Sequence, residues 1–293
     1  MEKFALIKEF EQFQPFKKMI LLQDGRFAAS DGNEVYIYNP KNNYNCEETI
    51  NTGNNVNFFI LLDNGQLVMY GNYNVSIWTF KESKYISTGE FSIIGKEIFS
   101  YHEYCNGLVS IYKNMIGFCG SKNFCIYDVE SPYDLKIKLR GHKNEIIKAI
   151  QPKNKDRLIT CDYTSEVIIW DLPNKLILNK YQFEKVEKPL LELTNGQIII
   201  PCQNEFIFLN GETFNIEKRD NEKKKISKIS IVGQFTNNYL IVNGYRVVEL
   251  YDLRTGDVLP FDEFTYSDKI ICLLILDEHT FVASDITAYI IQH

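Results

Sequence analysis

Histidine, methionine and tryptophan are scarce in this chain of 293 residues, which contains 4 His, 4 Met and 2 Trp. His102, His279 and His293 share no metal-ligand spacing with each other or with His142, so we expect no metal site and no cofactor. The seven cysteines are scattered and form no Cys-x-x-Cys pair. This pattern excludes a zinc knuckle or a disulfide framework and favours buried, reduced thiols.

Segments that direct a protein to a membrane or out of the cell are also missing. The longest apolar run, Ile270–Leu276, is far shorter than the roughly 20 residues that span a bilayer. Residues 1–8 have no signal-peptide apolar core, and Glu2 replaces the glycine that myristoylation needs. We therefore expect a cytoplasmic protein without membrane insertion. The net charge of −6 argues against nucleic acid as a partner.

Motifs of known catalytic sites are lacking as well. The chain has no Gly-rich phosphate loop, no nucleophile elbow and no His-Glu-x-x-His sequence. Acidic pairs such as Glu47-Glu48 and Asp277-Glu278 fall in expected loops, where carboxylates are usually solvated. We therefore expect no enzymatic activity and assign no catalytic residue.

Phenylalanine and tyrosine are abundant, with 20 Phe and 18 Tyr, and favour β structure because flat side chains suit a pleated, buried surface. Hairpins are indicated where apolar residues flank a short polar turn. Asp-Gly and Asn-Gly turns tolerate the positive φ angles of tight hairpins. Four such segments are Leu21–Ala28, Leu61–Val68, Leu191–Ile198 and Leu274–Phe281.

After each hairpin signal, a further apolar strand follows at a nearly constant distance. These strands are Val35–Tyr38, Val75–Trp78, Phe124–Tyr127, Val167–Trp170, Glu205–Phe208, Val248–Tyr251 and Ala288–Ile291. Their last residues are separated by 40, 49, 43, 38, 43 and 40 positions. A four-stranded propeller blade takes about 40–45 residues. The spacing therefore predicts an all-β, seven-bladed β-propeller.

Many of these strands are apolar at consecutive positions, as expected for sheets that are covered on both faces. No Pro/Ser-rich linker divides the chain, so we expect one domain over 1–293. The expected blades span 11–50, 51–95, 96–138, 139–181, 182–220, 221–264, and 265–293 together with 1–10. The strand-like stretch Phe4–Phe10 should close the ring by pairing onto the last blade as its outer strand.

The segment from Gly141-His142 to Trp170-Asp171 resembles a repeat of the WD family. Members of that family join a His, a Ser or Thr, an Asp and the Trp within a blade. His142, Thr160 and Trp170 match three of these positions, whereas the Asp position falls on Thr164. The resemblance implies a structural role for His142, Thr160 and Trp170, with an incomplete tetrad.

The resemblance also implies where a partner binds. In WD proteins one rim, called the top, carries the loops that lead into the inner strands and the turns between second and third strands. Tyrosine and arginine on such a rim are frequent anchors for proteins and peptides. The residues expected to bind a protein or peptide partner, within a larger assembly, are Asp31, Asn33, Asn72, Tyr73, Tyr104, Lys143, Tyr163, Tyr245, Arg246, Tyr266 and Asp285.

The function expected on this basis is that of a non-catalytic intracellular scaffold. One alternative is a substrate-recognition or ubiquitin-binding subunit of a ubiquitin-ligase pathway. Tyr251–Arg254 resembles the Trp-Asp-x-Arg motif with which some WD proteins bind the adaptor of a cullin ligase. A second alternative to the scaffold function is that of a propeller enzyme with a central site. The basic segment Lys218–Lys225 is either a solvated loop or a docking patch for an acidic partner or lipid.

Overall fold

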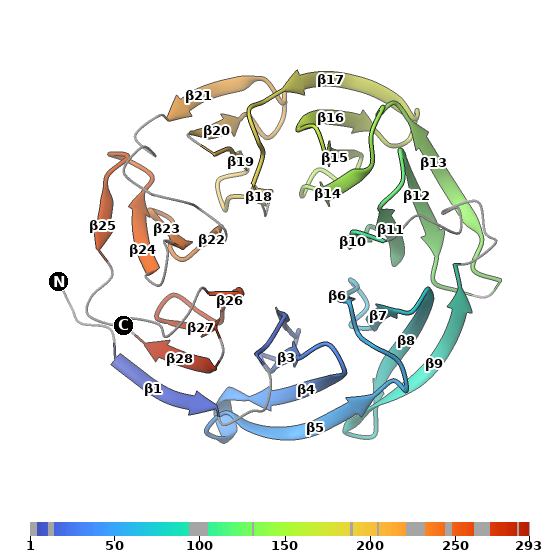
Figure 1. Ribbon diagram of the computed structural model, residues 1–293, viewed down its shortest axis with the longest axis vertical. Coiled ribbons are helices and arrows are strands. Elements are labelled where there is room, and N and C mark those ends of the chain that lie inside the picture. The colour runs from blue at the N-terminus through green and yellow to red at the C-terminus, as the bar shows by residue number, and fades with distance from the viewer. Residues whose placement is uncertain are drawn as a thin grey trace.

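The computed structural model describes residues 5–10, 15–93, 105–130, 132–187, 190–203, 205–220, 232–243, 248–260, 270–285 and 287–292. These residues form seven antiparallel four-stranded sheets arranged as blades around a central axis (Figure 1). The fold predicted from the repeat spacing, a seven-bladed β-propeller, is confirmed. Helical structure in the described residues is limited to the 3₁₀ turn η1, Pro40–Asn42.

The first four blades follow one another along the chain, each with its strands in sequence order. Blade 1 contains β2 (Lys18–Leu21), β3 (Phe27–Ser30), β4 (Glu34–Asn39) and β5 (Asn45–Asn51). Blade 2 contains β6 (Phe58–Leu61), β7 (Leu67–Gly71), β8 (Asn74–Lys81) and β9 (Lys84–Ser92). Blade 3 contains β10 (Gly107–Ile111), β11 (Met115–Cys119), β12 (Asn123–Asp128) and β13 (Leu135–Arg140). Blade 4 contains β14 (Ile146–Ile150), β15 (Arg157–Asp162), β16 (Glu166–Asp171) and β17 (Leu176–Gln182).

The last three blades complete the ring. Blade 5 contains β18 (Leu191–Glu192), β19 (Ile198–Pro201), β20 (Phe206–Leu209) and β21 (Ile216–Asp220). Blade 6 contains β22 (Val232–Gln234), β23 (Tyr239–Asn243), β24 (Val248–Asp252) and β25 (Val258–Pro260). Blade 7 contains β26 (Cys272–Ile275), β27 (Thr280–Ser284), β28 (Ala288–Gln292) and, as its outer strand, β1 (Ala5–Phe10).

The N-terminal strand closes the ring, as predicted. β1 runs antiparallel to β28, with Ala5 opposite Gln292 and Phe10 opposite Ala288. β1 also contacts blade 1, because Lys8 Nζ donates hydrogen bonds to the carbonyl oxygen of Asn43 at 2.8 Å and to Oδ1 of Asn45 at 3.2 Å. The two ends of the chain are thereby joined in one sheet, which lies beside the first blade.

Seven apolar clusters make up the core, and each is shared by two neighbouring blades. The cluster between blades 3 and 4, for example, contains Phe124 and Ile126 from one sheet and Leu158 and Trp170 from the other. A blade must therefore be apolar on both faces. This explains why strands such as β20 are buried at every position.

Hydrogen bonds between hairpin turns join successive blades at the rim opposite the start of the inner strands. A backbone group in one turn bonds a side chain from the adjacent blade, with distances between 2.6 and 3.0 Å. The bonds are Gln23 Nε2 to Asp63 O, Asn64 N to Asn114 Oδ1, Tyr112 N to Gln151 Oε1, Lys153 N to Glu192 Oε2, and Thr194 N to Gln234 Oε1. The repeated contact fixes the positions of blades 1 to 6 relative to one another.

Over the part of the chain that the structure describes, no helix is both long and apolar enough to cross a membrane.

Candidate functional site

The rim where the inner strands begin also carries the turns between second and third strands. The first residue of an inner strand pairs with a residue at or next to the end of the second strand, as Lys18 does with Ser30 and Phe58 with Tyr70. Gly107 pairs in the same way with Cys119. We call this rim, with the loops that lead into the inner strands, the top rim.

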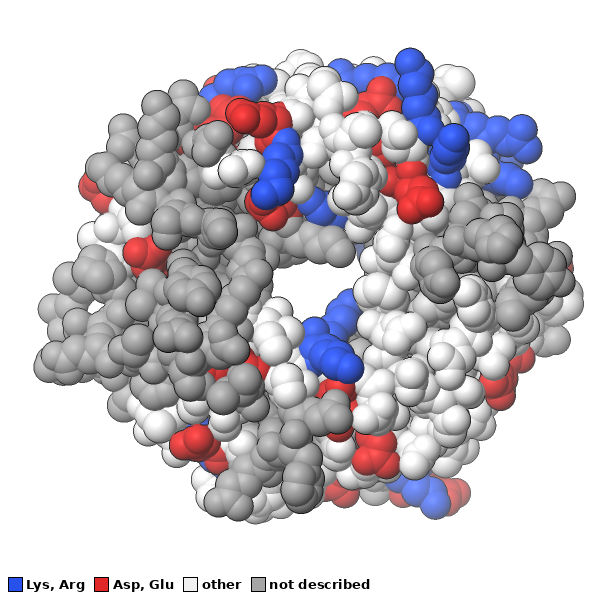
Figure 2. All heavy atoms as spheres, viewed as in Figure 1, with Lys and Arg blue, Asp and Glu red and all other residues white. Residues whose placement is uncertain are grey.

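A cavity of about 230 Å³ lies at the top rim, where the axial channel opens. Figure 2 shows the channel as an open hole through the ring, with basic side chains at its edge. The lining comes from four inner strands (β2, β6, β10 and β14), from Asn106 and Cys119, and from the segment before β18. It consists of Lys18, Phe58, Asn106, Gly107, Leu108, Val109, Cys119, Ile147, Lys148, Ala149 and Leu190. This cavity is large enough for a side chain of a partner.

Two lysines give the cavity a positive character within a protein of net negative charge. Lys148 is only 8 % exposed, and its ammonium group donates a hydrogen bond to the carbonyl oxygen of Val186. The positive charge of Lys18 favours the thiolate form of Cys105 and so acts to lower its pKa, and Lys148 acts in the same way on Cys161. Burial nevertheless raises the pKa of both thiols to about 12, so they stay protonated at neutral pH.

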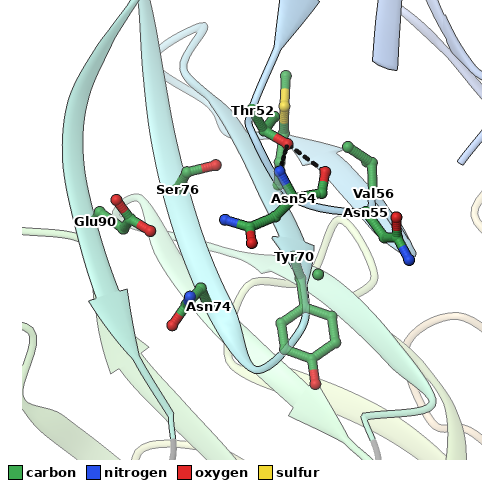
Figure 3. A pocket seen from close by; sticks show the side chains of 10 residues that line it. Thr52, Asn54, Asn55, Val56, Tyr70, Asn74, Ser76 and Glu90 are labelled. Atoms are coloured by element: carbon green, nitrogen blue, oxygen red, sulfur yellow. Dashed lines mark hydrogen bonds between the residues drawn. The ribbon is translucent and has the colours of Figure 1, made fainter. Parts of the chain in front are cut away.

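A second, polar hollow lies between blades 1 and 2 and has a volume of about 10 Å³ (Figure 3). This volume holds about one water molecule and no larger ligand. Its wall includes Gly71, where an added Cβ would lie 1.3 Å from the carbonyl oxygen of Asn55. Glycine is therefore required at this position, because the loop before β6 packs directly on its backbone.

The predicted partner-binding residues differ in their accessibility. Tyr163 is 77 % exposed, the largest value among the exposed large hydrophobic residues of the described chain. Its backbone nitrogen donates to the Glu145 carbonyl oxygen, two residues before Ile147 in the cavity wall. Lys143, Asn33 and Asn72 are also exposed on the top rim.

Two other predicted residues, Tyr73 and Asp31, have structural contacts. Tyr73 is half-buried and packs against the apolar cluster between blades 2 and 3. The Asp31 carboxylate accepts hydrogen bonds from the Asn33 and Glu34 backbone nitrogens and from the Tyr36 hydroxyl group. These hydrogen bonds allow Asp31 to stabilise the turn between β3 and β4.

Asp285 was expected on the binding face, but the structure places it in the interior. Its exposure is 0 %, and its carboxylate accepts a hydrogen bond from the Thr287 backbone nitrogen at 2.8 Å. This side chain caps the turn between β27 and β28, as Asp and Asn commonly do, and therefore does not belong to the exposed surface. The remaining four predicted residues, Tyr104, Tyr245, Arg246 and Tyr266, lie outside the described residues.

The predicted His-Thr-Trp arrangement is present in blade 4. Nε2 of His142 and Nε1 of Trp170 each lie 2.7 Å from Oγ1 of Thr160. The indole can only donate, so Thr160 accepts its hydrogen bond. All three side chains are buried, and they join the loop before β14 to β15 and β16.

The Asp position of the motif holds Thr164, as expected, but Asp162 brings a different carboxylate close to His142. Its Oδ2 lies 3.4 Å from Nδ1 of His142, while Thr164 donates to Oδ1. Oε2 of Glu166 lies at the same distance of 3.4 Å from Nδ1. The motif spacing did not point to Asp162, because this carboxylate stands two residues before the position that the motif assigns to Asp.

Burial and hydrogen bonding shift the pKa values of this group. Burial lowers the pKa of His142 against the opposing effect of Asp162 and Glu166. Burial opposes ionisation of Asp162, but hydrogen bonds from Thr164 and from the backbone nitrogen of Glu166 hold its pKa below the usual value. A neutral His142 imidazole next to an ionised Asp162 carboxylate is the expected state at neutral pH.

The basic segment and the Tyr251–Arg254 motif engage in local contacts. Lys218 Nζ lies 2.9 Å from Oδ2 of Asp220, and residues 221–225 lie outside the described residues. The guanidinium group of Arg254 donates to both carboxylate oxygens of Asp252 at 3.1 and 2.9 Å. This pair stabilises the turn between β24 and β25.

Phe58, Lys18 and Lys148 in the cavity wall were not predicted from the sequence. One signal was available, because Lys148 interrupts the apolar run of β14 (Ile-Ile-Lys-Ala-Ile). A lysine within an otherwise apolar strand often marks a polar environment, here the channel. Phe58 gave no such signal, because a Phe at the start of an apolar strand is ordinary.

Neither a scan against models of known protein families nor a search of curated proteins finds a match for this sequence. The resemblance to WD repeats therefore remains a proposal based on motif spacing, and the fold is established independently of it.

Proposed function

We propose that this propeller is a non-catalytic scaffold that binds a protein or peptide partner on its top rim. The observation that carries the proposal is the exposed ring of Tyr163 on the same rim as the 230 Å³ cavity. An exposed aromatic side chain next to a concave, mainly apolar surface is a frequent arrangement at binding hot spots. β-propellers commonly serve as interaction scaffolds, which also supports the proposal.

The chemistry of the cavity indicates the kind of partner. Phe58, Leu108 and Ile147 offer apolar contact, and Lys18 and Lys148 add positive charge. No carboxylate is found among the described residues that line the cavity. We expect a partner segment that places an acidic side chain, next to an apolar one, in the channel mouth.

Affinity purification followed by mass spectrometry tests this proposal with two matched variants. Tyr163→Ala removes the exposed aromatic ring of the top rim. Tyr112→Ala removes a ring that is 43 % exposed at the hairpin turn on the opposite rim. We expect specific partners to be lost from Tyr163→Ala and retained by Tyr112→Ala. Equal recovery of every partner by both variants would show that the binding face lies elsewhere.

A charge-reversing variant then tests the expected chemistry of the partner. Lys18→Glu places a carboxylate in the cavity. Lys17→Glu makes the same charge change at the neighbouring residue, which is exposed and does not line the cavity. For an acidic partner segment, Lys18→Glu should weaken binding at least about tenfold, while Lys17→Glu should have a smaller effect. Unchanged affinity of the Lys18→Glu protein would argue against an acidic ligand group.

A further inference from the structure

Three polar atoms from different parts of blade 4 face one another in the interior. They are Nδ1 of His142, Oδ2 of Asp162 and Oε2 of Glu166, which all lie within 4.8 Å of one another. The nitrogen is 3.4 Å from each of the two oxygens. The side chains of His142 and Asp162 are 0 % and 1 % exposed, and that of Glu166 is 21 % exposed.

Within the described structure, none of these three atoms has a hydrogen-bond partner. Other contacts nevertheless hold the His and Asp side chains in place. His142 Nε2 bonds Thr160, and Asp162 Oδ1 accepts from the backbone nitrogens of Thr164 and Glu166. Buried polar atoms without partners are unfavourable, so three of them within 4.8 Å of one another indicate a missing positively charged group.

The hydrogen bonds around Thr160 are compatible with an imidazole that binds a metal through Nδ1. The hydroxyl oxygen can accept one bond from Trp170 and one from Nε2–H of His142, and its proton then points to the Ile168 carbonyl oxygen at 3.4 Å. In that tautomer Nδ1 carries a lone pair. A metal-bound histidine typically donates its other ring N–H in this way.

We propose that His142, Asp162 and Glu166 bind a divalent transition-metal ion, with Zn²⁺ as the best fit. Zinc bonds to nitrogen and oxygen of about 2.0–2.2 Å place two ligands of a tetrahedral site about 3.3–3.6 Å apart. The two distances from Nδ1, both 3.4 Å, fall within this range. One histidine and two carboxylates leave the fourth position of a tetrahedral site open. The site would hold the turn that carries Tyr163.

This proposal is independent of the proposed function and reverses the expectation from the sequence that no metal is bound. The sequence offered no ligand spacing because the histidine precedes the carboxylates by 20 and 24 positions. Lys180 is the nearby cation, with Nζ 3.6 Å from Oε1 of Glu166. Its charge offsets part of the carboxylate charge and should moderate the affinity for a metal.

The test is calorimetric titration of the chelator-treated, full-length protein with zinc chloride. The wild-type protein should bind one equivalent of zinc. Glu166→Gln, which removes the most accessible ligand, should weaken binding at least about tenfold. Glu145→Gln changes an exposed carboxylate near the same turn and should bind as the wild type does. Circular dichroism of each variant reports whether the fold is retained, and Asp162→Asn provides a second ligand variant.

Cobalt binding separates this site from the cysteines. The Co²⁺-substituted protein should show no thiolate charge-transfer absorption, because the proposed ligands contain no sulfur. Three results would overturn the proposal. One is failure of the wild-type protein to bind zinc. Another is equal zinc affinity of the wild-type and Glu166→Gln proteins. The third is an NMR spectrum with both ring nitrogens of His142 protonated at saturating zinc, which would show that a proton fills the site.

Discussion

The indole nitrogen of Trp170 donates a hydrogen bond of 2.7 Å to the hydroxyl oxygen of Thr160, deep inside blade 4. The same oxygen lies 2.7 Å from Nε2 of His142. One hydroxyl group therefore joins the third strand, the second strand and the loop before the first. Trp78 holds the equivalent place in blade 2, where it pairs with Leu67 of the second strand. Its indole nitrogen does not bond the second strand but donates a hydrogen bond to Ser76 on its own strand.

Thr160→Val should destabilise the protein strongly while preserving the shape of the side chain. The change leaves the Trp170 N–H group and the Nε2 position of His142 without their partner, at a cost of about 2–4 kcal/mol in the free energy of unfolding. Chemical denaturation measures this loss. Thr49→Val, at an exposed strand position, is the control and should change stability by less than about 0.5 kcal/mol. Similar stability of both variants would contradict the proposed importance of the hydroxyl group.

Deletion of residues 1–10 should lower the stability of the entire ring. The deletion removes the outer strand of blade 7 and the ring of Phe10, whose centroid lies 4.9 Å from that of Tyr38 in blade 1. Phe10→Ala alone should cost about 3–5 kcal/mol. Leu6→Ala, on the same strand but 45 % exposed, should have little effect. Differential scanning calorimetry is the measurement, and an unchanged melting temperature after the deletion would refute closure by β1.

Gly71→Ala should be much less tolerated than Gly107→Ala. An added Cβ at Gly71 would overlap the Asn55 carbonyl oxygen at 1.3 Å, whereas at Gly107 the nearest atom, Cys119 Cβ, is 3.9 Å away. The overlap must push the loop away from β7, at a cost of about 1–3 kcal/mol. Thermal melting of the two variants compares these effects. Equal melting temperatures would mean that the loop moves without a penalty.

One thiol should react rapidly in the native protein. Cys46 is exposed, whereas Cys105 and Cys161 are buried with pKa values raised to about 12 by burial. Titration with a disulfide reagent at pH 8 should therefore label one cysteine quickly and all seven after denaturation. The Cys46→Ser protein should lose the fast phase. A second fast phase in that variant would show that another thiol is accessible.

The stability contribution of Asp252 should disappear in acid. Its hydrogen bonds from Arg254 lower its pKa in the folded protein from 3.8 to about 2. Because the folded pKa is lowered, this contribution is present above pH 3.8 and is lost as the pH falls toward 2. Denaturation midpoints of wild type and Asp252→Asn should therefore differ near pH 6 and converge near pH 2. A constant difference between the two proteins would contradict this assignment.

The blade count and the strand types were predictable because they depend on local patterns. The pairs Asn64-Gly65 and Asn195-Gly196 predict hairpin turns, because glycine readily adopts the positive φ angles that such turns require. Gly65 and Gly196 adopt these angles in the structure. Leu67 and Val68 are apolar in succession because blades cover both sides of β7. Such features are encoded within a few neighbouring residues.

The candidate site was less predictable, because it joins residues that are distant in the chain. Asp285 and Tyr163 occupy similar turns, yet one is buried and the other is exposed. Burial in a propeller depends on the neighbouring blade, which the local sequence does not specify. Likewise, Lys18 and Lys148 line the same cavity only because the ring brings blades 1 and 4 around one axis.

The sequence by itself determined the repeat, its length of roughly 40 residues and the N-terminal strand that closes the ring, since strand periodicity and turn chemistry are local properties. Only the tertiary structure decided that Asp162 and Glu166, rather than Thr164, face His142. The physical reason is that the direction of a carboxylate in a turn depends on the backbone hydrogen bonds that it accepts. Those bonds exist only after the chain has folded.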